Sequence, residues 1–285
     1  MQIEPLRPKV VHEVVARALA EDRAAEDITT LATVGSELRG TARFVAKEAG
    51  VLSGMPVAFE AFRQLDADVR LVEGLADGAS FERGDTIALF EGPVRALLQG
   101  ERTALNFIQR MSGSATMTRR FVDAVAGTNA VILDTRKTTP GLRDIEKYAV
   151  RCGGGTNHRR DLAVMAMIKD NHREALHRRG WTLADGVEAI RNLAAGAAVE
   201  VEIDGLNDLE AALVASPEWV LLDNMAPAAM REAVIRTAGR TKLEASGGVN
   251  LETVRAIAET GVDAISVGAL THSARALDIG MDLAF

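Results

Sequence analysis

The sequence contains a single cysteine, no long apolar run and no apolar leader. Cys152 cannot form a disulfide within the chain, and no second cysteine or histidine cluster at metal-ligand spacing accompanies it. We therefore expect neither redox chemistry nor a zinc site. No uninterrupted apolar stretch approaches the roughly 18–20 residues that a membrane-spanning helix needs, and the first ten residues, MQIEPLRPKV, lack the apolar core of a signal peptide. These absences predict a soluble, cytoplasmic protein with no membrane partner.

The chain as a whole also has no excess of positive charge. Its 285 residues include 33 Lys and Arg against 40 Asp and Glu, and the net charge of -7 argues against nucleic acid as the main partner. Residues 131–180 differ, because they hold 11 basic but only 6 acidic residues, together with three of the five histidines. A cationic segment in an acidic chain predicts a small anionic ligand. The alternative is a solvated basic surface.

The first part of the sequence mixes helical and β-like patterns. Residues 9–20 carry an apolar stripe at helical spacing, and residues 38–90 alternate short β-like stretches with glycines around one helical run near 56–65. From 94 to about 126 the helical period returns. The Ser-Gly-Ser sequence at 112–114 is expected to break this stretch into two helices.

After residue 127 strands, loops and helices alternate. The candidate strands are mostly unbroken apolar runs, which is typical of parallel strands covered on both faces, and they occupy residues 131–135, 165–170, 198–203, 219–224, 242–246 and 264–270. This repeat predicts an α/β barrel over residues 113–272. Residues 1–112 are predicted to form a separate α+β sandwich domain, with a tail of about 273–285 packing back on it.

Polar residues close most of these strands. In parallel α/β barrels, reactive groups gather at the carboxyl ends of the strands, so we expect one shared site around Asp134, Lys169, Glu202, Asp223 and Ser246. Several positive charges and an imidazole belong to the same region, namely Arg136, Lys137, His158, Arg159 and Lys169. Charge-assisted hydrogen bonds contribute about 1.5–3 kcal/mol each, and the set therefore predicts a ligand with at least two carboxylates.

Acidic and glycine-rich strand ends point to a second kind of ligand. Glu202 and Asp223 close neighbouring strands and offer the oxygen ligands that Mg²⁺ takes; a structural pair of solvated carboxylates is the alternative. The sequences at 246–248 (SGG) and 267–269 (VGA) lie where backbone N–H groups can approach a phosphate, although ordinary βα turns use such glycines too. Together these features predict a phosphate, a metal-bound polyphosphate or diol, and a dicarboxylate.

Seven strings of residues are long and specific enough to compare with a known family: ERTALNFIQRMSG (101–113), LDTRKTTPGLRDIEKYAVRCGGGTNHR (133–159), IKDNH (168–172), VEVEI (199–203), LLDN (221–224), EASGGV (244–249) and VGALTHS (267–273). They resemble the quinolinate phosphoribosyltransferases, also called nicotinate-nucleotide pyrophosphorylases (carboxylating). The resemblance implies an N-terminal α+β sandwich domain and an open, incomplete α/β barrel, in a homodimer whose active sites borrow residues from the partner. It also implies a reaction that joins quinolinate to phosphoribosyl pyrophosphate (PRPP), releasing pyrophosphate and CO₂ and giving nicotinate mononucleotide for NAD synthesis.

The resemblance implies a role for each matching residue. Quinolinate would be bound by Arg102, reaching across the dimer interface, and by Thr135, Arg136, His158, Arg159 and Lys169. PRPP would be bound by Lys137, Glu202, Asp223, Ser246, Gly247, Gly248, Val267, Gly268, Ala269 and His272, with Glu202 and Asp223 also holding Mg²⁺. The implied catalytic residues are Lys137, Lys169, Glu202 and Asp223. None of them is expected to act as a covalent nucleophile, because the pyridine nitrogen of quinolinate attacks the anomeric carbon.

Three other functions stay open at this point. A paralogous family linked to molybdenum transport shares the fold and several motifs, although the intact cationic set favours quinolinate. A barrel aldolase would use Lys169 as a Schiff base, and a non-catalytic protein would bind quinolinate without releasing pyrophosphate. The sequence departs from the family pattern at a few positions, where we expect altered loop shape and packing but no lost ligand: Ser114, Asp161, Val164 and Arg173.

Overall fold

The computed structural model describes residues 3–285, which form two compact units that are each discontinuous in the chain. The first unit comprises residues 3–119, 138–154 and 270–285, and the second comprises residues 120–137 and 155–269. The domain boundaries 1–112 and 113–272 stay a prediction, and residues 1–2 lie outside the described part. Among residues 3–285, no helix is both long enough and apolar enough to cross a membrane.

A four-stranded antiparallel sheet forms the centre of the first unit. Its order is β12-β1-β5-β3, with β1 at Arg39–Ala46, β3 at Arg70–Gly74, β5 at Thr86–Pro93 and β12 at Ile279–Ala284. Alternate residues of β1 are buried, as expected for a strand with one covered face. Three phenylalanines, Phe44, Phe62 and Phe90, pack in the core with ring centroids 4.9 to 6.0 Å apart.

Helices and a short strand pair complete this unit. They are α1 (Pro8–Glu21), α2 (Ile28–Thr33), α3 (Met55–Arg63), most of α4 (Val94–Ala124), α5 (Arg143–Cys152), β2 (Gly50–Val51) and β4 (Ser80–Phe81). The helices predicted at 9–20 and 56–65 correspond to α1 and α3. Both carry Pro within the first two positions, where its missing N–H costs no hydrogen bond.

Helix α4 is continuous over Val94–Ala124, so the predicted break at 112–114 is wrong. The small residues there serve close packing instead. A Cβ on Gly113 would lie 1.9 Å from the backbone oxygen of Arg275, so only glycine allows this approach. Ser112 is buried, and its hydroxyl accepts a hydrogen bond from the backbone N–H of Ser53 at 3.0 Å. A polar, glycine-containing triplet can therefore mark a helix face against a neighbour rather than a helix end.

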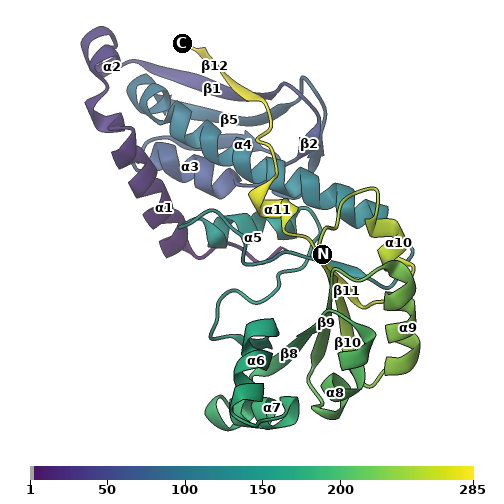
Figure 1. Ribbon diagram of the computed structural model, residues 1–285. Coiled ribbons are helices and arrows are strands. Elements are labelled where there is room, and N and C mark those ends of the chain that lie inside the picture. The colour runs from purple at the N-terminus through teal and green to yellow at the C-terminus, as the bar shows by residue number, and fades with distance from the viewer. Residues whose placement is uncertain (1–2) are drawn as a thin grey trace. The chain divides into compact units, whose positions relative to one another are not determined.

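A six-stranded parallel sheet forms the centre of the second unit. Its order is β6-β11-β10-β9-β8-β7, with β6 at Val131–Leu133, β7 at Met165–Ile168, β8 at Ala198–Ile203, β9 at Trp219–Asp223, β10 at Lys242–Ser246 and β11 at Ala264–Ser266. Figure 1 shows the helices that alternate with these strands: α6 (Asp170–Arg178), α7 (Leu183–Leu193), α8 (Leu209–Val214), α9 (Pro227–Thr237) and α10 (Val254–Ala258). No pairing joins β6 to β7 within residues 3–285, so the sheet is open. The predicted fold class is confirmed.

Four of these six strands end before the residue at which they were predicted to end. β8 and β10 have the predicted bounds, whereas β6, β7, β9 and β11 end one to four residues early. β6 and β11 pair over only three residues each, and α11 (Ala269–His272) begins where the last strand was predicted to continue. Of the polar residues, Asp134 and Lys169 follow the last residue of their strands, whereas Glu202, Asp223 and Ser246 belong to the carboxyl-terminal ends of theirs.

Candidate active site

The carboxyl ends of the parallel strands surround a cavity of about 580 Å³ in the second unit. The parallel register explains this, because it places strand ends at one edge of the sheet; Ser246, for example, pairs with Asp223. Most site residues expected from the sequence line the cavity: Thr135, Arg136, Lys137, His158, Arg159, Lys169, Glu202, Asp223, Ser246, Gly247 and Gly248. The sequence predicted this gathering, because the carboxyl ends of parallel strands lie at one edge of a sheet.

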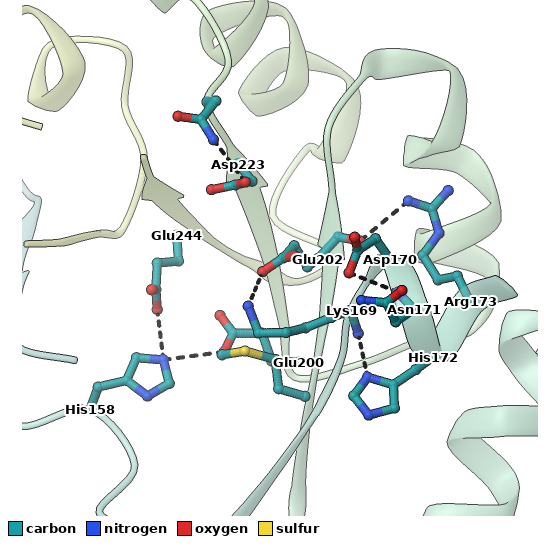
Figure 2. A network of polar contacts seen from close by, with 12 residues as sticks. His158, Lys169, Asp170, Asn171, His172, Arg173, Glu200, Glu202, Asp223 and Glu244 are labelled. Atoms are coloured by element: carbon teal, nitrogen blue, oxygen red, sulfur yellow. Dashed lines mark hydrogen bonds and ion pairs between the residues drawn. The ribbon is translucent and has the colours of Figure 1, made fainter. Parts of the chain in front are cut away.

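Lys169 lies between β7 and α6 and is held at its backbone. Its N–H donates to Nδ1 of His172 at 3.1 Å, in the first turn of α6. Its ammonium nitrogen lies 2.5 Å from Oε2 of Glu202, as Figure 2 shows. Arg173, on the same helix, pairs with Asp208 and reaches the backbone oxygen of Glu202 at 3.5 Å. The atypical Arg173 therefore links α6 to the end of β8.

Glu202 and Asp223 lie at the ends of the neighbouring strands β8 and β9, and both face the cavity. The Glu202 side chain is 14% exposed, and one oxygen of Asp223 accepts a hydrogen bond from the Asn224 amide at 2.9 Å. Mg²⁺ in phosphate sites usually binds one or two carboxylates together with water and substrate phosphates. Two carboxylates at the edge of a polar cavity fit a magnesium ion that arrives with a polyphosphate.

Arg136 and Arg159 supply positive charge to the same cavity. Arg159 donates to the backbone oxygen of Met165 at 2.9 Å. Burial, and then the positive charge of Arg136, lower the pKa of Arg159, while three nearby carboxylates oppose this shift. Two guanidinium groups at one cavity repel each other, so an anion bound between them removes an unfavourable interaction. The pair therefore favours a negatively charged ligand.

A second hollow of about 540 Å³ shares these cations. It is lined largely by apolar side chains from β7, α6 and α7, including Ile168, Leu176 and Ile190, and it has Arg136, Arg159, Met167 and Lys169 in common with the polar cavity. Apolar walls bury a ring efficiently, and the cations satisfy charged substituents. A flat ring that carries carboxylates suits this combination.

His158 lines the cavity, but its ring is already bonded within the protein. Figure 2 shows Nε2 between two carboxylates, 3.2 Å from Glu200 and 3.1 Å from Glu244. Burial raises the pKa of Glu200 to about 7, which the hydrogen bond from His158 opposes and the neighbouring Glu244 reinforces. Burial disfavours a charged imidazole, but the hydrogen bonds to the two carboxylates outweigh it and raise the pKa of His158.

Glu200 and Glu244 were missed by the sequence analysis. One signal was present: in AVEVEI, Glu200 and Glu202 are two residues apart and thus on the same face of an otherwise apolar strand. For Glu244, in the middle of KLEAS, no comparable signal exists. The cavity also includes residues that were not predicted, namely Met167, Leu221, Asn224 and Ser266.

The loop after β10 requires glycine for both conformation and space. Gly247 has φ +91° and Gly248 has φ +60°, which is the left-handed region that side chains with a Cβ rarely adopt. A Cβ on Gly247 would lie 2.2 Å from Oδ1 of Asn224, whereas nothing lies within 4 Å of the corresponding position on Gly248. The loop thus lies against the end of β9, and its backbone borders the cavity.

The remaining predicted site residues lie elsewhere. Arg102 is exposed on α4 in the first unit. His272 is exposed in the same unit, with Nδ1 2.6 Å from the hydroxyl of Ser273. Three residues follow β11 directly and do not line the cavity described here: Val267, Gly268 and Ala269. Their roles stay predictions.

Known protein families match almost the whole length of the chain. Residues 27–112 match the family described as quinolinate phosphoribosyl transferase, N-terminal domain, and residues 114–282 match its C-terminal domain. This chain belongs to the quinolinate phosphoribosyltransferase family. The resemblance carried by the seven strings is thereby confirmed.

Individual members of the quinolinate phosphoribosyltransferase family are similar over nearly their full length. The nicotinate-nucleotide pyrophosphorylase [carboxylating] of Mycobacterium leprae is 45% identical over 277 residues, which cover 95% of this chain and 96% of that protein. The probable enzyme of the same name from Bacillus subtilis is 42% identical over 264 residues, covering 92% and 90%. The solved structure of the nicotinate-nucleotide pyrophosphorylase from Francisella tularensis superposes with a TM-score of 0.92 at 37% identity, covering 100% and 99%.

Proposed function

We propose that this protein transfers the phosphoribosyl group of PRPP to quinolinate and releases CO₂, giving nicotinate mononucleotide and pyrophosphate for NAD synthesis. The names of its relatives support this reaction. The observation that carries it in the structure is one cavity that joins a cationic set to two carboxylates and a glycine-rich loop. A pyridine dicarboxylate needs the first, and a magnesium-bound phosphoribosyl group needs the other two.

Quinolinate carries two negative charges on a flat ring. Arg136, Arg159 and Lys169 are placed to bind its carboxylates, and the adjoining apolar hollow is suited to the ring. Guanidinium groups bind carboxylates through two parallel hydrogen bonds, which fixes orientation as well as charge. Thr135 borders the same cavity, and its hydroxyl accepts from the backbone N–H of Lys137 at 3.0 Å. These contacts would hold the pyridine nitrogen in a fixed direction.

PRPP is assigned to the other side of the cavity. Glu202 and Asp223 would hold the ribose hydroxyls and Mg²⁺, and Ser246 with the two following glycines would bind the 5′-phosphate through backbone N–H groups. Bound Mg²⁺ supplies positive charge against the pyrophosphate leaving group. The assignment of Val267, Gly268, Ala269 and His272 to the same phosphate follows from the family resemblance alone.

The reaction needs alignment and charge stabilisation more than a reactive side chain. The pyridine nitrogen attacks the anomeric carbon as the bond to pyrophosphate breaks, and the ring nitrogen becomes cationic. The neighbouring carboxylate then leaves as CO₂, its bonding electrons stay on the ring carbon, and that carbon takes a proton. Holding the two reactants in line contributes about 7–11 kcal/mol to lowering the barrier, and Lys137 and Lys169 border the cavity where charge develops.

Product formation is the direct test of this proposal. Purified protein incubated with quinolinate, PRPP and MgCl₂ should form nicotinate mononucleotide and pyrophosphate in equal amounts, which chromatography and a pyrophosphate assay measure. The absence of product with all three components present would show that the proposal is wrong. Borohydride trapping of a carbonyl substrate on Lys169 would instead favour an aldolase, a function that no observation within residues 3–285 supports.

We also propose a homodimer in which Arg102 completes the partner's quinolinate site. Arg102 is an exposed arginine in α4, next to Glu101, on a helix whose neighbouring residues Thr103, Ala104 and Leu105 are buried. An arginine at such a position is suited to pairing with a carboxylate outside its own unit.

Replacing Gly247 with Ala should raise KM for PRPP about tenfold more than Gly248→Ala does, where a tenfold change corresponds to about 1.4 kcal/mol. Ala at position 247 adopts a strained positive φ, at a cost of about 1–3 kcal/mol. The added Cβ would also collide with Asn224 and displace the loop. Gly248→Ala is the matched control, since it has the same strain but open space around its Cβ. Steady-state kinetics with each substrate varied would measure both variants. Equal KM values for the two would show that the close approach to Asn224 does not shape the PRPP site.

A further inference from the structure

Two buried carboxylates meet one imidazole at the wall of the cavity, and no step of the proposed reaction uses them. Glu200 on β8 and Glu244 on β10 have exposed side-chain fractions of 0% and 2%, and that of His158 is 8%. Both carboxylates approach the same ring nitrogen, Nε2, at 3.2 and 3.1 Å (Figure 2). The second oxygen of Glu200, Oε1, is buried without a hydrogen-bond partner within the described residues.

A buried cluster of two carboxylates and one imidazole lowers the stability of the fold. A buried carboxylate loses its hydration, and the bond to one imidazole only partly replaces it. Two carboxylates that share one nitrogen are more unfavourable still, because they repel each other. Apolar residues would fill these positions on β8 and β10 more stably, so the cluster points to a role in function.

The segment that carries His158 is fixed from several directions. Asp134 accepts hydrogen bonds from the backbone N–H of His158 at 2.8 Å and from the amide of Asn157 at 2.6 Å. On the imidazole, Nδ1 accepts from the backbone N–H of Arg159 at 2.6 Å, while Nε2 faces the carboxylates. The ring is therefore bonded on both nitrogens, and it determines the direction in which the next residue leaves.

Arg159 is the residue that this arrangement directs. Its guanidinium is held by the backbone oxygen of Met165 at 2.9 Å and lines both the polar cavity and the apolar hollow. A small rotation of His158 would move the Arg159 backbone N–H, and with it the guanidinium. Because bidentate carboxylate binding depends on the plane of the guanidinium, such a movement would weaken the contact.

We infer that Glu200 and Glu244 are positioning residues that hold His158 and thereby orient Arg159 for a carboxylate of quinolinate. This inference rests on the proposed function. It gives the imidazole an indirect role, through the backbone of Arg159, in place of direct contact between Nε2 and substrate. It also predicts that hydrogen-bond acceptors at Glu200 and Glu244 matter more than their negative charge.

The test compares two substitutions of Glu244. Glu244→Gln removes the charge but keeps an oxygen that accepts from Nε2, whereas Glu244→Leu removes both. Glu244→Leu should raise KM for quinolinate about tenfold or more, as expected for losing a hydrogen bond in a charged cluster, whereas Glu244→Gln should stay within about threefold of wild type. KM for PRPP should change little in either variant. Glu218→Gln is the control, because Glu218 pairs with Arg191 next to the start of β9 and does not line the cavity.

Several outcomes would overturn the inference. If Glu244→Gln and Glu244→Leu raise KM for quinolinate equally, the lost negative charge explains the effect and the hydrogen-bond acceptor does not. If neither raises it, the cluster does not influence quinolinate binding. A lower kcat with unchanged KM would indicate a purely structural role, since loss of folded protein lowers the amount of active enzyme without changing its affinity. A metal ion that purified wild type retains and Glu244→Leu loses would make the three side chains ligands instead.

The corresponding substitutions of Glu200, to Gln and Leu, repeat the comparison from the other strand and decide the matter if Glu244→Leu does not fold. Activity of the wild type distinguishes failure of the proposed function from failure of the positioning inference. If wild type forms no nicotinate mononucleotide, the proposed function is wrong. If wild type is active and Gln and Leu variants do not differ in KM for quinolinate, only the positioning inference is wrong.

Discussion

Replacing Glu202 with Gln should lower kcat/KM for PRPP by about 10- to 100-fold, because a charge-assisted interaction contributes about 1.5–3 kcal/mol. The same loss is expected for Asp223→Asn. Each change removes a negative charge from the edge of the cavity where Mg²⁺ and the ribose are assigned. Glu202→Gln has a second effect, since the Lys169 ammonium, 2.5 Å from Glu202, loses its partner. KM for quinolinate should therefore also rise in Glu202→Gln, but less in Asp223→Asn.

The double variant shows whether the two carboxylates act together. Residues that share a ligand give losses that do not add, so Glu202→Gln with Asp223→Asn should lose less than the product of the two single effects. Titrating MgCl₂ at fixed PRPP should show a higher half-saturating concentration in each variant. Glu210→Gln, which affects an exposed carboxylate on α8, is the control. Unchanged kcat/KM in both single variants would remove the pair from the PRPP site.

Much of the second unit could be predicted from the sequence, because its strands are short, apolar and evenly spaced. β8 and β10 begin and end where the apolar runs do. The residues at the carboxyl ends of such runs meet at one edge of a parallel sheet by geometry, and this predicts that Lys169, Asp223 and Ser246 lie together. The structure places these residues at one cavity, and their chemical roles stay predictions.

The sequence was less informative where function or packing depends on contacts between distant segments. Ser112 and Gly113 indicate a helix break only if their neighbours are unknown. In the fold, the Ser112 hydroxyl accepts a hydrogen bond from the backbone N–H of Ser53, and the backbone oxygen of Arg275 lies where a Cβ on Gly113 would be. Glu244 likewise has no local signature, since a strand glutamate normally faces solvent. Glu244 is buried, and its partner His158 comes from a loop far away in the sequence. Pairings of this kind require the tertiary structure.

Co-expressing Arg102→Ala with Arg136→Ala should restore activity to two proteins that are each nearly inactive alone. If every site takes Arg136 from one subunit and Arg102 from the partner, a hybrid dimer has one site with both substitutions and one site with neither. Random pairing makes half of the dimers hybrids, and half of the sites in a hybrid are intact. The mixture should therefore reach about a quarter of wild-type kcat, as the symmetry of a two-fold dimer requires.

The control for this experiment uses two residues from the same chain. Arg136 and Arg159 line one cavity within a single unit, so a hybrid of Arg136→Ala and Arg159→Ala leaves one defect in each of its two sites and should show no recovery. Mass measurement of differently tagged subunits would establish that hybrids form in both mixtures. Recovery in the first mixture alone identifies Arg102 as the residue that crosses between subunits. A shared site must regain activity whenever it contains one intact copy of each arginine. If hybrids form and neither mixture recovers, Arg102 therefore acts within its own chain or outside the site.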